Sequence, residues 1–194
     1  MSMKSSELID EVKLITQENI QVLRKQFIEF NAQQRSWKKD KNVWNINEVL
    51  THLIEYANYY HQTFLLKINK TKFRESREVF TSSPLGKAAW KSMKLGTLKN
   101  IKRKIKSPKQ YNPLVGDITT NKFAMELFIE KQEELLQIID LAADVDLKRV
   151  RIPISISKIV RLRLGDALLF VCYHNQRHMQ QILNLINHPE FPKK

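Results

Sequence analysis

Apolar side chains recur at intervals of three and four residues in four long stretches of this chain. This period gives an α-helix one buried face, so each stretch predicts an amphipathic helix. The predicted helices cover residues 5–31, about 46–64, about 120–142, and 164–166 to 186. Four helices that each hide one face from water favour a helical bundle.

Polar residues and proline mark the expected helix ends. The candidate caps are Asn45 or Asn47 for the second helix and Asp117, Thr119 or Thr120 for the third. Asp144 to Asp146 are expected to end the third helix. The fourth stops at Asn187-His188-Pro189, because proline cannot continue a helix.

The connections between the helices determine the topology of such a bundle. Residues 68–117 show no sustained period, and a connection of this length does not require neighbouring helices to alternate in direction. Residues 150–160 alternate like a strand, but Pro153 and the lack of a partner strand favour an extended connection. We predict an all-α fold with one domain, residues 1–194, in which a long, partly helical crossover joins helices two and three.

The positive charge is concentrated in that same connection. The chain carries a net charge of +13, and residues 68–117 hold 13 Lys or Arg against Glu75, Glu78 and Asp117, which gives 13 − 3 = +10. Such a segment could bind nucleic acid, with Phe73, Trp90 or Tyr111 as stacking surfaces. A solvated charged connection, or a guide for an anionic substrate, is the alternative.

Little in the sequence points to export or to a membrane. The N-terminal segment is amphipathic and acidic residues interrupt it, and no stretch supplies about 18 consecutive apolar residues. The chain has one cysteine, Cys172, which excludes an internal disulfide. We expect a cytoplasmic protein with no membrane partner.

Three of the five histidines are spaced for metal binding. His174 and His178 are four residues apart on the fourth helix, so both imidazoles project from one face. At about 100° per residue, they and His52 on the second helix lie roughly 50° to 90° from the centre of the apolar stripe. Residues at the margin of a core can line an open cleft, and a catalytic metal needs three protein ligands and one open position.

The neighbouring residues receive other roles. Cys172 projects into the core and is expected to be a packed thiol, whereas Asn175 falls at an apolar position where it could orient a ligand or line the cleft. Arg177 is expected to be solvated or salt-bridged. His61 and His188 are expected at the surface.

The chain resembles the DinB/YfiT-like superfamily of four-helix proteins. The resemblance rests on W-N-I-N-E-V-L-T-H-L at residues 44–53, L-G-D-A-L to H-N-Q-R-H-M-Q-Q-I at 164–182, and K-S-P-K-Q-Y-N-P at 106–113. It implies that His52, His174 and His178 bind a divalent metal. Relatives use that metal to activate a thiol such as bacillithiol or mycothiol, or for isomerisation or hydrolysis. Asn175 stands where the family's H-E-x-R-H pattern has an acid.

Together these features predict a metal-dependent enzyme that activates a thiol or a water. We expect zinc or nickel, with iron or manganese as alternatives, because imidazole suits several of these ions. The expected partners are a small-molecule substrate and a low-molecular-weight thiol, and a homodimer is left open. A non-catalytic binding or stress-associated protein is the alternative function.

Overall fold

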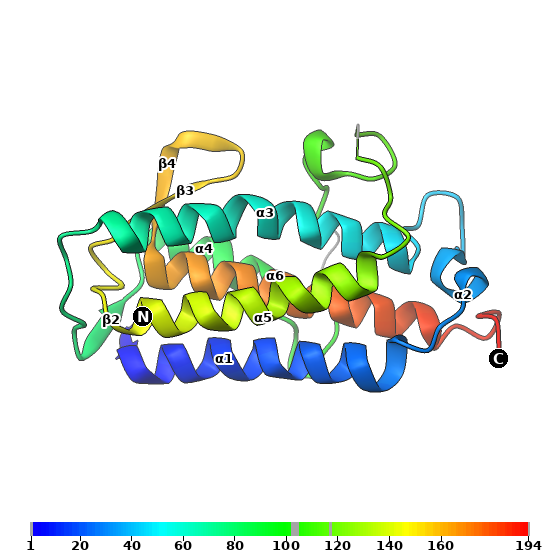
Figure 1. Ribbon diagram of the computed structural model, residues 1–194, viewed down its shortest axis with the longest axis horizontal. Helices are drawn as coiled ribbons and strands as arrows, with labels where there is room; N and C mark the ends of the chain where they lie inside the picture. The colour runs from blue at the N-terminus through cyan, green and yellow to red at the C-terminus, as the bar shows by residue number, and fades with distance from the viewer. Residues whose placement is uncertain (1, 102–104, 117, 194) are drawn as a thin grey trace.

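Four long helices lie side by side and form the main body of the molecule (Figure 1). The computed structural model describes residues 2–101, 105–116 and 118–193. Within these residues the long helices are α1 (Ser5–Val22), α3 (Ile46–Lys70), α5 (Ala124–Ala143) and α6 (Leu164–Ile186). A turn of π-helix, Leu23–Phe27, continues α1. The predicted helical bundle is confirmed, with two small sheets added to it.

The long helices do not alternate in direction. α3 and α5 run the same way, and α1 and α6 run the opposite way (Figure 1). α1 and α3 each pack against both α5 and α6. Because α3 ends at the opposite end of the bundle from the start of α5, the chain between them must return along the bundle. This is a crossover connection of the kind that its length allows.

The crossover connection contains short elements of its own. Its described part holds β2 (Val79–Thr81), α4 (Pro84–Met93) and the 3-10 turn η2 (Lys109–Tyr111), and β2 pairs with the N-terminal β1 (Ser2–Lys4). Ser83 caps α4, and its backbone N–H and hydroxyl both donate to the buried carboxylate of Asp166 on α6, at 3.0 Å. The connection therefore packs closely on the bundle and is partly helical, as predicted.

Residues 151–163 form a hairpin, which corrects the expectation of an extended connection. β3 (Arg151–Ile154) pairs antiparallel with β4 (Ser157–Arg163). The partner strand β4 extends to Arg163, beyond the alternating segment at residues 150–160. Pro153 lies beside a register shift in a two-stranded sheet, where a missing N–H donor is tolerated.

The start of α5 is later than predicted. Phe123 occupies the N-cap position without a side-chain cap, and the turn before it is held by Asn121, whose side chain accepts the Phe123 N–H at 2.8 Å. Thr119 and Thr120 precede the helix, so neither caps it. Asp117, the third candidate, lies outside the described residues.

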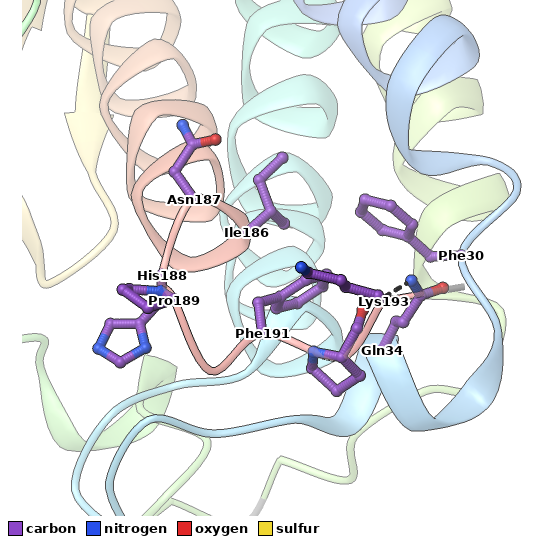
Figure 2. A pocket seen from close by; sticks show the side chains of 9 residues that line it. Phe30, Gln34, Ile186, Asn187, His188, Pro189, Phe191 and Lys193 are labelled. Atoms are coloured by element: carbon purple, nitrogen blue, oxygen red, sulfur yellow. Dashed lines mark hydrogen bonds between the residues drawn. The ribbon is translucent and has the colours of Figure 1, made fainter.

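The C-terminal segment folds back onto the first connection, near the short helix α2 (Ala32–Ser36) (Figure 2). The Gln34 amide donates to the carbonyl of Pro192 at 3.0 Å, and the rings of Phe30 and Phe191 lie 5.6 Å apart. A pocket of about 560 Å³ opens here. Among the described residues that line it, His188 is the one metal-ligating side chain, so this pocket offers no metal site.

Side chains from all four long helices are shielded from solvent in the core, among them Leu8, Leu53, Leu135 and Leu168. The prediction that His61 lies at the surface is wrong. His61 is 1% exposed, and its Nδ1 lies 2.9 Å from Oε2 of Glu134 on α5. α3 packs against two helices, so a second face is covered besides its apolar stripe. Within the described residues, no helix has both the length and the apolar character needed to cross a membrane.

Candidate metal centre

Two helices supply the three histidines. Asn45 caps α3, because its side chain accepts the Glu48 N–H at 2.8 Å while the Glu48 carboxylate accepts the Asn45 N–H at 2.9 Å. This reciprocal cap was one of the two predicted, and it starts the helix less than two turns before His52. His174 and His178 lie one turn apart on α6, which packs against α3.

The structure brings the three predicted histidines together. Their ligand nitrogens all lie within 4.8 Å of one another, and the Nε2 atoms of His52 and His174 are 3.2 Å apart. Two nitrogens that share an ion at about 2.0–2.1 Å are separated by roughly 2.9 Å in octahedral and 3.3 Å in tetrahedral geometry. The separation of the His52 and His174 nitrogens fits a common ion, and the three-imidazole donor set suits a divalent metal.

Two hydrogen bonds orient the rings. Nδ1 of His52 lies 2.6 Å from the carbonyl oxygen of Tyr111, and Nδ1 of His178 lies 2.9 Å from Oε1 of Gln181. Both partners are acceptors, so each Nδ1 carries the proton and each Nε2 keeps its lone pair. These outer contacts were not anticipated from the sequence. Gln181 could have been, because it lies three residues after His178 on the same helix.

All three imidazoles are neutral at neutral pH, which is the form that binds metals. Burial lowers the pKa of His52 to about 4, against the opposing effect of its bond to Tyr111. Burial, and then repulsion from His52 and Arg177, lowers the pKa values of His174 and His178 well below the usual range. His52 and His174 are buried residues, and His178 keeps some exposed surface.

Aromatic side chains enclose the cluster. The ring of Trp44 lies 6.0 Å from His178 in a stacked arrangement, and Phe170 stacks on His174 at 5.8 Å. Each of these rings covers one face of its imidazole, which restrains the imidazole and keeps water from that face.

A cavity of about 810 Å³ adjoins the histidines. All three line it, as the margin positions in the helical projection predicted. Arg177 also lines it and is 6% exposed, so of the two predicted alternatives, solvated or salt-bridged, the solvated one is wrong. Asn175 is buried but does not line the cavity, and so it is not one of the residues that a substrate in the cavity would meet.

The remaining reactive side chains lie away from this cavity. Cys172 is fully buried, as predicted, with its Sγ 3.7 Å from the Thr16 hydroxyl, and burial raises the pKa of its thiol to about 12. His188 is partly exposed next to Trp37 and is not a member of the cluster, which agrees with a surface position.

The aromatic residues expected to stack on nucleic-acid bases are not available for it. Trp90 is 2% exposed and Tyr111 is 8% exposed. Phe73 is partly buried, with the Arg149 guanidinium 3.9 Å above its ring. The prediction of stacking surfaces at Trp90 and Tyr111 is therefore wrong.

Comparison with known proteins gives the family. The sequence model of the DinB superfamily matches residues 15–182, which includes all three histidines and the crossover connection. The chain belongs to the DinB superfamily. No curated protein matches this DinB-superfamily chain, and no solved structure matches it either.

Proposed function

We propose that this DinB-superfamily protein is a metal-dependent enzyme in which His52, His174 and His178 hold a zinc or nickel ion. The observation that carries the proposal is the convergence of their ring nitrogens within 4.8 Å beside a large cavity. Three histidines leave a coordination position for a reactant, as catalytic sites require. A divalent ion supplies, when bound, a Lewis acid that lowers the pKa of a thiol or a water and polarises an electrophile.

The surrounding residues prepare the site for this chemistry. Tyr111 and Gln181 hold protons at Nδ1 of His52 and His178, which leaves the Nε2 lone pair of each ring available to a metal. Trp44 and Phe170 shield the imidazoles, which strengthens electrostatic interactions in the site. These residues thereby orient the metal ligands and exclude part of the water from the site.

The lining of the cavity favours a thiol over a water as the activated group. Among its described residues there is no Asp or Glu to act as a general base. A thiol with a pKa of about 8.5 needs only a small decrease to ionise near pH 7, whereas water starts near 15.7. We therefore propose thiol S-transfer as the leading reaction and hydrolysis as the second.

Metal analysis of protein purified without a histidine tag tests the proposal. We expect close to one zinc or nickel per chain in the wild type and a large loss in His174→Ala. His188→Ala is the matched control, because this histidine lies outside the cluster, and it should keep the metal. Equal, near-zero occupancy in all three proteins would contradict the proposal.

Activity separates an enzyme from a binding protein that kept its histidines. The metal-loaded protein is incubated with low-molecular-weight thiols and electrophiles, and thiol consumption is followed. Consumption that depends on the metal and is lost in His174→Ala supports the enzyme. Full metal occupancy with no turnover of any pair favours the non-catalytic alternative.

A further inference from the structure

The cavity next to the histidines is much larger than a metal site needs. Its volume of about 810 Å³ falls in the range of pockets that bury organic ligands, roughly 300–1,000 Å³. Most of its walls are aliphatic or aromatic, including Trp44, Met93, Ile105, Leu162 and Phe170. A ligand that fills this space must therefore bury a large apolar part.

The charges in the cavity have one sign. Lys106 and Arg177 are the charged side chains among the described lining residues, and no carboxylate is present. Arg177 lies between His174 and His178 in the sequence of α6. Its guanidinium has five N–H donors, so it can donate to a ligand carboxylate in addition to the contacts that it already makes. An anionic group would thus be stabilised near the histidines, and a cationic group would not.

The entrance is apolar and is built from three segments. Leu85 on α4, Ile105 in the connection and Ile156 in the hairpin all line the cavity, yet they are 53%, 42% and 61% exposed. A hydrogen bond of 3.4 Å from the Gln110 amide to the Ser155 carbonyl joins the connection to the hairpin. Large apolar side chains that are both exposed and cavity-lining suit the passage of an apolar ligand.

We propose that the cavity binds a single-chain amphipathic anion, with its carboxylate or phosphate near Lys106 and Arg177 and its apolar chain towards Leu85 and Ile156. The inference rests on the proposed function in one respect, namely that this ligand is the substrate presented to the metal. Binding itself requires only the cavity, so it can be measured without metal.

The test is calorimetric titration of chelator-treated wild-type protein with four C12 amphiphiles below their micellar concentrations. We expect dodecanoate and dodecyl phosphate to bind about tenfold more tightly than neutral dodecanol, and dodecylammonium to bind most weakly. The ratio of the dissociation constants of dodecanoate and dodecyl phosphate identifies the anionic group that the cavity prefers. Equal binding of anion and cation would overturn the proposal.

Two pairs of variants locate the ligand. Lys106→Glu should weaken dodecanoate about tenfold, whereas Lys109→Glu, at an exposed site that does not line the cavity, should change it less than twofold. Ile156→Glu should weaken every C12 ligand, and Ile159→Glu, 90% exposed in the same hairpin, should not. If the two variants of each pair bind the ligands equally, the assigned position of the ligand is refuted.

Repeating the titration with zinc-loaded protein separates this inference from the proposed function. Dodecanoate binding in a protein that takes up no metal would support the ligand class and contradict the metal enzyme. Metal binding without any C12 binding would contradict the ligand class and leave the metal proposal intact.

Discussion

Gln181 offers a direct test of how the candidate centre is organised. Its Oε1 accepts the Nδ1 proton of His178 at 2.9 Å and thereby leaves the Nε2 lone pair available as a ligand. Gln181→Leu removes the acceptor while keeping a side chain of similar size. The His178 ring would then be free to rotate or to shift its proton to Nε2, and either change removes a ligand.

The size of the effect follows from the position of Gln181. Loss of such an outer contact weakens metal affinity by about 10- to 100-fold, or about 1.4–2.7 kcal/mol. Gln181 is only partly buried, so water can take the place of its amide oxygen. We therefore expect the lower limit, about a tenfold increase in the dissociation constant for zinc. Gln181→Glu should instead preserve or strengthen binding, because a carboxylate is a better acceptor.

The neighbouring glutamine supplies a matched control for this measurement. Gln180 donates to Asn184 at 2.9 Å on the exposed face of α6, so Gln180→Leu removes a hydrogen bond without touching the centre. Zinc affinities of the variants are compared by competition with a chelating dye at fixed pH. Equal dissociation constants for the Gln180→Leu and Gln181→Leu proteins would refute the orienting role of Gln181.

Three further predictions concern the body of the protein. Burial raises the pKa of the Cys172 thiol to about 12, so an aromatic disulfide reagent at pH 8 should modify this thiol only in denaturant. Rapid modification of the folded protein would contradict the packing of Cys172. Gly86→Ala should lower the free energy of unfolding in urea by about 1–3 kcal/mol, because the new Cβ would lie 2.1 Å from the buried Asp166 carboxyl. An unchanged urea midpoint would disprove this close packing. Burial lowers the pKa of His61, so protonation of this histidine in the unfolded chain should reduce stability as the pH falls below about 6.5. The urea midpoint of His61→Gln should therefore decline less steeply with falling pH than that of the wild type. Identical pH profiles would count against a neutral buried His61.

The helices and the histidine cluster were predictable because both depend on local spacing. A stripe with a period of 3.6 residues can be recognised without knowing its partner, and residues four apart share a face in any helix. The spacing therefore paired His174 with His178, and the projection placed His52 on an equivalent margin. The carbonyl of Tyr111 could not be found this way, because every residue has one and only the fold decides which carbonyl faces His52.

The errors concern residues that a second neighbour covers. The projection of α3 or α6 assigned one buried face to each helix, so it placed His61 at the surface and left Arg177 either solvated or salt-bridged. In the structure α3 contacts both α5 and α6, and α6 is also covered by α4. The positions of such additional layers depend on long-range packing, which no local pattern in the sequence encodes.

The length of the crossover connection is itself an argument about function. Returning along α3, whose 25 residues span about 37 Å, would take about 11 or 12 extended residues. The chain instead uses 124 − 70 − 1 = 53 residues between α3 and α5. The additional length places α4 on α6, the Tyr111 carbonyl on His52, and residues 105–108 in the wall of the cavity. Part of the basic segment is thus used to build the candidate site, and Lys106 is the one charged residue of its described part that lines the cavity.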